Sequence, residues 1–235
     1  MTGKKLALLI LSSIGGLLLL VGLGLLLLGR SQAQEIERLA GGQVLHTLTQ
    51  LSQTPPGVAV MLQGKIAERN SLFEQEFVAY VRQQYRGERC VTPTPTHNNY
   101  VGVTRCEPIW TEEKRETPRL WLELPEGRVQ LANTNYRLQN SPTIWQSTTD
   151  LIKDQTVRYE GFKIGAPVFT QGTVVVEDDT PTLRVGFIYG GDSQAYLYDQ
   201  RSSISILFLL GSIFILVGTI TLVDMGVILW VGGKR

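Results

Sequence analysis

The chain has 235 residues, with 22 basic against 21 acidic side chains and a formal net charge of +1. Between its two apolar ends, residues 31–200 carry 16 Lys/Arg and 20 Asp/Glu, a formal charge of −4. This balance excludes nucleic acid as a partner on electrostatic grounds. The middle region is long enough to bury a core as one domain and too short for two comfortable ones.

Two uncharged or nearly uncharged runs lie near the ends of the chain. Residues 6–29 are dominated by leucine and hold no charge, and residues 204–231 hold one, Asp224. A helix needs about 20 apolar residues to cross about 30 Å of hydrocarbon. Lipid forces such segments to be helical, because their backbone groups find no water there. The sequence predicts one transmembrane helix within residues 1–30 and another within 201–235.

The first run has an alternative reading as a signal peptide. Lys4 and Lys5 would form its basic start, and Ser31-Gln32-Ala33 resembles a cleavage site. The apolar run is about 23 residues, well beyond the 7–15 of a signal sequence. A membrane helix is therefore favoured, and the middle region is exported in either case.

Basic residues beside the two runs predict the orientation. They are more frequent on the terminal sides, and short cytoplasmic segments carry such an excess. We therefore expect both termini in the cytoplasm and the middle region in the periplasm or an organelle lumen. The residues concerned are Lys4 and Lys5 before the first run, Arg30 after it, Arg201 before the second run, and Lys234 and Arg235 after it.

Residues 31–54 show apolar side chains at three- and four-residue spacing. This pattern predicts a short amphipathic helix, weakened by Gly41-Gly42 and ended by Thr54-Pro55-Pro56-Gly57. The helix would pack on the following domain or lie on a bilayer surface.

Residues 55–200 change to the alternating pattern of strands. Short strands with turns about every ten residues predict an all-β domain, either a barrel or a sandwich. The clearest hairpin turns at Pro125-Glu126-Gly127, and a second turn is expected at residues 178–181. Tyr196 and Tyr198 then lead into the second apolar run as interfacial anchors. The expected strands are 58–62, 64–69, 77–81, 99–104, 119–124, 128–131, 156–164, 168–177 and 183–189.

Cys90 and Cys106 are the two cysteines of the chain, and they flank a Pro/Thr-rich segment. An exported domain favours a disulfide between them, which would contribute about 3 kcal/mol. The alternative is a pair of reduced thiols, as expected in the cytoplasm. A zinc site is disfavoured, since His97 would bring the nearby ligands to only three.

Catalytic motifs are absent from the sequence. Neither His46 nor His97 neighbours a nucleophile motif, and no phosphate loop or metalloprotease motif occurs. The sequence therefore predicts a non-enzyme without a cofactor or metal.

Two groups of acidic residues are candidate metal or catalytic sites, but neither is favoured. One is expected to lie in a solvated loop, and the other in a hairpin turn where calcium binding is less favoured than solvation. The groups are Glu112, Glu113 and Glu116, and Glu177, Asp178 and Asp179.

A basic and aromatic strip precedes Cys90. It could meet anionic headgroups or a partner. We favour the simpler interpretation that these side chains alternate along an edge strand. The strip consists of Tyr80, Arg82, Tyr85, Arg86 and Arg89.

Asp224 lies inside or at the edge of the second apolar run. A carboxylate at mid-bilayer costs about 2.5–3.5 kcal/mol, so we expect Asp224 at the cytoplasmic interface. Small residues in both runs would permit close contact, either between the two helices or with a partner. They are Ser12, Gly15, Gly16, Gly22 and Gly24 in the first run, and Gly211, Gly218 and Gly226 in the second.

Four stretches of the chain resemble the GIDE family, which includes mitochondrial and chloroplast envelope ubiquitin ligases. The resemblance covers roughly residues 45–220 and consists of loose patterns of glycine and alternating apolar residues. It implies a β-rich domain flanked by membrane helices. The stretches are 54–66 (TPPGVAVMLQGKI), 77–82 (FVAYVR), 122–130 (LELPEGRVQ) and 160–176 (EGFKIGAPVFTQGTVVV).

Ligase activity does not follow from this resemblance. Family ligases end in a RING finger with about eight Cys/His ligands for two zinc ions, whereas this chain has two cysteines and two histidines. It resembles the RING-less relatives of bacteria, cyanobacteria in particular, which implies a plasma or thylakoid membrane. We expect a binding, scaffold, assembly or quality-control protein whose β domain contacts another membrane or lumenal protein. The alternatives are an accessory subunit of a membrane enzyme complex and a lipid-binding module.

Overall fold

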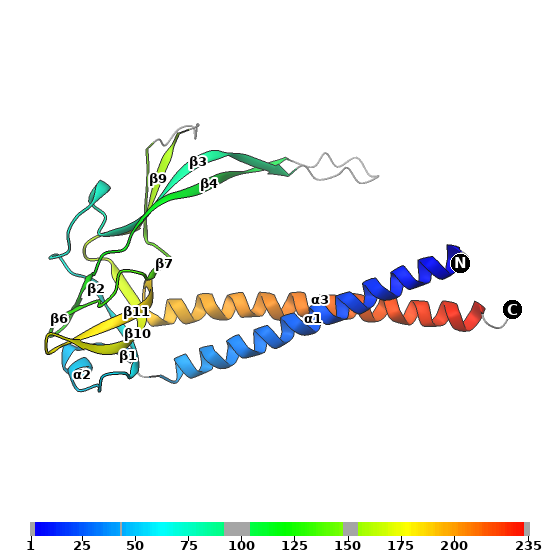
Figure 1. Ribbon diagram of the computed structural model, residues 1–235, viewed down its shortest axis with the longest axis horizontal. Helices are drawn as coiled ribbons and strands as arrows, with labels where there is room; N and C mark the ends of the chain where they lie inside the picture. The colour runs from blue at the N-terminus through cyan, green and yellow to red at the C-terminus, as the bar shows by residue number, and fades with distance from the viewer. Residues whose placement is uncertain (1–2, 43, 92–103, 148–154, 233–235) are drawn as a thin grey trace. The chain divides into compact units, whose positions relative to one another are not determined.

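The computed structural model describes residues 3–42, 44–91, 104–147 and 155–232, and the chain divides into two compact units. One unit consists of Met1–Gly42 with Gln194–Arg235, and the other is the β-rich region Gln43–Ser193. Figure 1 shows the long helices of the first unit and the strands of the second. The β unit therefore begins and ends earlier than the predicted limits of 55 and 200.

The first unit is a pair of antiparallel helices, α1 (Gly3–Ala40) and α3 (Ser193–Gly232) (Figure 1). Among the described residues, both are long and apolar enough to cross a membrane, although signal sequences and buried soluble helices also meet this condition. Here the leucine, isoleucine and valine side chains stay largely exposed along both helices. Such exposure is unlike the core helix of a soluble protein.

A seam of buried positions joins α1 and α3. These positions recur every seven residues in both helices, a repeat that favours a left-handed supercoil of the pair. Three of the four positions in α1 and two of the three in α3 are glycine. They are Gly15, Gly22, Gly29 and Ile36 in α1, and Ile204, Gly211 and Gly218 in α3.

The glycines let the two backbones approach closely. A Cβ atom added at Gly22 would lie 2.8 Å from the carbonyl oxygen of Gly211, and one added at Gly218 would lie 2.9 Å from that of Gly15. Real Cβ atoms essentially never come this close to a backbone oxygen. The contact therefore requires glycine, and it fixes the antiparallel register, with Gly22 opposite Gly211 and Gly15 opposite Gly218.

Large side chains of each helix fill the space above the glycines of the other. Side-chain atoms of Leu26 would lie 3.0 Å from a Cβ at Gly211, and those of Leu19 3.0 Å from a Cβ at Gly218. Phe208 takes the corresponding place at Gly29, at 3.5 Å. Small residues had been expected to permit close helix contact, and the structure places that contact between the two apolar helices themselves.

The predicted helical linker over residues 31–54 is wrong as a single element. Helix α1 continues without a break through the polar residues after Arg30, and it ends at Ala40 before Gly41-Gly42. A short strand, β1 (Val44–Leu45), and a five-residue helix, α2 (Leu48–Ser52), follow. Helix α2 begins separately because Thr47 and Gln50 form a capping box at its start.

The larger sheet of the β unit has seven strands in the order β6-β5-β2-β10-β11-β7, with β1 paired to β2. The alternating apolar residues predicted its long strands, and the expected hairpins β5–β6 and β10–β11 are confirmed. The three-residue strand β7 was not expected. The bounds are β2 (Ala59–Ile66), β5 (Trp121–Leu124), β6 (Gly127–Gln130), β7 (Arg137–Gln139), β10 (Pro167–Glu177) and β11 (Thr180–Gly190).

The smaller sheet has four strands in the order β4-β3-β9-β8. The predicted loop around Glu112 and Glu116 is wrong, because these residues belong to strand β4. The expected strand 99–104 falls almost entirely outside the described residues. The bounds are β3 (Ala79–Val91), β4 (Arg105–Glu116), β8 (Thr143–Gln146) and β9 (Val157–Phe162).

One apolar core connects the two sheets. Residues at the start of β3 and the end of β9 pack with fully buried residues of the larger sheet, such as Leu62 and Leu183. They are Val78, which directly precedes β3, Ala79 and Phe162. Burying a side chain of this size contributes about 1.5–3 kcal/mol. The prediction of a β-rich region is therefore confirmed, in the form of two sheets that share a filled core.

The seam generates a stability prediction for the helix pair. Gly22→Ala should lower the free energy of unfolding by about 1–3 kcal/mol, because its methyl group overlaps the backbone of α3. Gly24→Ala is the matched control, since nothing lies within 4 Å of a Cβ at Gly24. Thermal unfolding of the purified chain in mild detergent measures both changes. Equal losses of stability for the two substitutions would contradict the close glycine contact between α1 and α3.

Candidate functional site: the ribbon of strands β3 and β4

Strands β3 and β4 extend beyond the smaller sheet as a two-stranded ribbon (Figure 1). Strand β9 pairs with β3 only from Ala79 to Gln84. Past that point, β3 continues to Val91 opposite the first half of β4. Nearly all of the side chains on this outer part are exposed. The outer ribbon, which we define as residues 86–91 and 105–109, therefore contributes little to the core.

A disulfide crosses the outer ribbon. Cys90 and Cys106 are direct partners in the antiparallel register, with sulfur atoms 2.00 Å apart and Cα atoms 4.0 Å apart. The two cysteines thus lie at disulfide distance, as the sequence predicted. Glu88 lies within 4.8 Å of both sulfurs, but sulfur atoms bonded to each other offer no thiolate to a metal. His97, weighed as a zinc ligand, lies outside the described residues.

An aromatic and cationic stack holds the base of the ribbon. The rings of Tyr85 and Trp110 meet edge to face, with centroids 5.7 Å apart. The guanidinium of Arg158, on β9, lies 4.5 Å from the Trp110 ring and donates to the side-chain oxygen of Gln83. Sequence reasoning missed this stack, because nothing in the polar sequence around Trp110 indicated a strand opposite Tyr85.

The side chains of the predicted basic strip differ in burial along strand β3. Tyr80 and Tyr85 are buried, whereas Arg86 is exposed. The guanidinium groups of Arg82 and Arg86 lie 3.0 and 3.4 Å from the same carboxylate, that of Glu113. Two of the three arginines therefore share one negative partner, so the strip is less cationic than its sequence indicated.

The favoured interpretation of this strip as an edge strand is wrong over Ala79–Gln84, where β3 pairs with both β4 and β9. The remaining arginine, Arg89, lies on the outer ribbon directly opposite Glu107. Opposite charges on facing residues of two strands stabilise the pairing by a few tenths of a kcal/mol, up to about 1 kcal/mol.

A second polar network lies around Tyr80 and Tyr159. The Lys114 ammonium lies 2.9 Å from Glu116 and donates to the Tyr80 hydroxyl at 3.3 Å. These bonds, the one to Glu116 foremost, raise the pKa of Lys114. The Tyr159 hydroxyl donates to Glu74, and burial together with this bond raises the Tyr159 pKa. Each of these groups has a partner, so the network links the short helix η1 (Glu74–Glu76) to the sheet.

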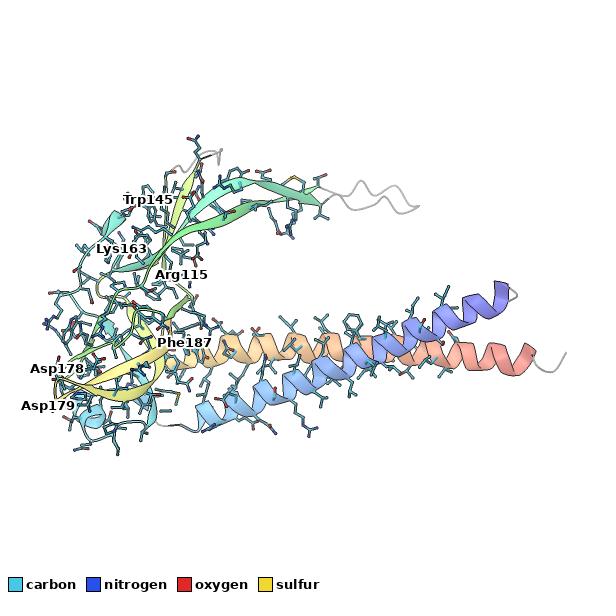
Figure 2. The ribbon with its side chains drawn as sticks, in the orientation of Figure 1. Arg115, Trp145, Lys163, Asp178, Asp179 and Phe187 are labelled. Atoms are coloured by element: carbon cyan, nitrogen blue, oxygen red, sulfur yellow. A yellow bond between two sulfur atoms is a disulfide. The ribbon has the colours of Figure 1, made fainter. Side chains whose placement is uncertain are left out.

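The acidic groups weighed as sites have local partners. Glu112 accepts two hydrogen bonds from Arg115, which lowers the Glu112 pKa. Glu177 lies 2.9 Å from Arg119. The labels of Figure 2 place Asp178 and Asp179 in the turn between β10 and β11, where their positive φ angles of 49° and 57° fit the turn that was predicted.

An open groove of about 460 Å³ interrupts the edge of the larger sheet. It lies where β1 and β5 pair with successive parts of β2, and His46, Lys65 and Glu123 line it. His46 is exposed, and its backbone N–H donates to Gln50. Nothing in the sequence indicated this groove, because its residues come from four separate strands, β1, β2, β5 and β10, or from their flanks.

Asp224 is exposed on α3. It lies twenty residues beyond Ile204 in one continuous helix, about 30 Å along the axis. Continuing the glycine register places it level with Leu9, about one turn from Ser13 towards the N-terminus of α1. This separation equals the thickness of a bilayer core, so the interfacial placement of Asp224 stays a consistent prediction.

No protein-family model, curated protein or solved structure matches the chain. The resemblance to the GIDE family therefore remains a prediction.

The disulfide should limit local opening of the outer ribbon. Replacing both cysteines (Cys90→Ser with Cys106→Ser) removes the link that closes the loop, at a cost of up to about 3 kcal/mol. Amide hydrogen exchange should then accelerate in residues 86–91 and stay unchanged in β10 and β11, which pair with each other elsewhere. Unchanged exchange in the outer ribbon would show that strand pairing alone holds it.

Proposed function

We propose that the chain is an integral membrane protein whose α1–α3 pair anchors an exported β domain. Each helix uses its glycine face against the other, and the remaining apolar surface of the pair is exposed. A lipid bilayer is the solvent that such a surface requires. An exported location agrees with the bonded cysteines, because disulfides persist in oxidising compartments.

Within this arrangement, we propose that the β domain binds another membrane or lumenal protein through the outer ribbon. The observation that carries the proposal is that the ribbon is ordered and disulfide-linked, yet adds little to the core of its own domain. Exposed segments held on a rigid scaffold commonly carry binding. Its mixed charges and the exposed side chains of Val91 and Ile109 suit a protein partner better than a purely anionic surface.

A photo-crosslinking residue placed at two exposed valines tests the binding surface. Val91 lies on the outer ribbon and is 63% exposed, and Val176 lies on β10 and is 51% exposed. In intact cells, Val91 should give a discrete crosslinked band that Val176 does not. The same band should disappear when residues 87–108 are replaced by a two-residue turn. Matching patterns at both valines would contradict a role for the ribbon.

The proposed topology has a separate test. Compartment-sensitive reporters inserted at Gly57 and fused after Arg235 should report opposite sides of the membrane, because one helix separates the two positions. Reporters on the same side would refute the two-helix anchor, whatever the ribbon binds.

A further inference from the structure

A crevice of about 400 Å³ lies between α1 and α3 beyond the last seam glycine. It belongs wholly to the helix pair. Ala33, Ile36 and Glu37 of α1 line one side, and Arg201, Ile204 and Phe208 of α3 line the other.

The crevice exists because the packing pattern of the seam stops here. Leu19 and Leu26 fill the spaces over Gly218 and Gly211, and Ala33 is the next position in that series of seven. Its methyl group is too small to take the same role. The other helix has Ile204 opposite Ala33, whereas it has glycine opposite Leu19 and Leu26. The two backbones therefore cannot approach as closely here. An unfilled space remains between the two helices.

The lining changes character along the helix axis. Phe208 and Ile204 form an apolar end that adjoins the long apolar run. Arg201 follows one turn beyond Ile204, about 5 Å along the axis. In the glycine register, Glu37 is level with Tyr196 and thus about 7 Å beyond Arg201. The order away from the bilayer is therefore apolar surface, cation, anion.

The two charges are available to a ligand. Arg201 and Glu37 are both exposed, and none of the ion pairs found among the described residues involves either of them. A guanidinium binds phosphate through paired hydrogen bonds. A carboxylate placed farther out favours a ligand that carries a positive charge beyond its phosphate.

We propose that this crevice binds the headgroup of a zwitterionic glycerophospholipid. Its phosphate pairs with Arg201 and its amine with Glu37, while the glycerol and upper acyl carbons lie against Ile204 and Phe208. Phosphatidylglycerol, which lacks the amine, leaves the Glu37 carboxylate facing a negative headgroup and should bind less well. The inference rests on the membrane anchoring proposed above.

Native mass spectrometry of the full chain, released from nanodiscs containing equal phosphatidylethanolamine and phosphatidylglycerol, tests this site. The wild-type chain should retain about one phosphatidylethanolamine, with about a ten-fold preference over phosphatidylglycerol. Glu37→Gln should reduce that preference at least five-fold, and Glu35→Gln, on the same helix outside the crevice, should leave it unchanged. No preference in the wild-type chain would overturn the proposal.

Ala33→Leu separates lipid binding from folding. The larger side chain supplies the missing seam contact, so it should abolish retained phosphatidylethanolamine without lowering the thermal stability of the helix pair. Ala40→Leu, at the end of α1, is the matched control and should retain the lipid. Retention by Ala33→Leu equal to that of the wild-type chain would overturn the site. Release of the wild-type chain from membranes by alkaline carbonate would instead refute the anchoring itself.

Discussion

The contact between the backbones of Gly22 and Gly211 determines how closely the two long helices pack and which residues face each other. A Cβ atom at Gly22 would lie 2.8 Å from the Gly211 carbonyl oxygen, so a side chain there would push the helices apart. The register that this contact defines also brings Gly15 opposite Gly218. Because association of apolar helices in lipid gains little from the hydrophobic effect, such close packing is the main source of specificity available to them.

The register determines which residues of α1 and α3 lie at the same level along the axis of the helix pair. It places the ends of the two apolar runs, Gly29 and Ile204, opposite each other. Beyond that level both helices continue as polar helix for about ten residues, to Ala40 in α1 and from Ser193 in α3. If a bilayer surrounds the apolar runs, as proposed, Arg201 lies about 5 Å beyond their ends, at the level of the lipid headgroups.

Sequence reasoning found the parts of the fold that burial determines. The apolar runs predicted both long helices, and alternation predicted β2, β5, β6, β9, β10 and β11. Strand β4 was missed because nearly all of its side chains are exposed. It is held by backbone pairing with β3 and by cross-strand contacts such as Tyr85 with Trp110, which leave no periodic apolar signal.

The candidate sites were predictable to different degrees. The cysteine pair followed from composition, whereas the role of Glu113 in pairing with Arg82 and Arg86 depends on a bulge in β4. The seven-residue glycine spacing was present in the sequence. The spacing alone does not say which glycines face the other helix. A Cβ atom added at Gly16 or Gly24 of the same helix would meet nothing within 4 Å.

Electron paramagnetic resonance tests the glycine register most directly. Spin labels are placed on the full chain in lipid nanodiscs at Leu17 and Leu216, two exposed positions that the register makes level. A second pair, Leu17 with Leu209, is displaced by one seven-residue repeat, about 10 Å along the axis. The register predicts stronger dipolar broadening for Leu17 with Leu216. Equal broadening in both pairs, or stronger broadening for Leu17 with Leu209, would contradict it.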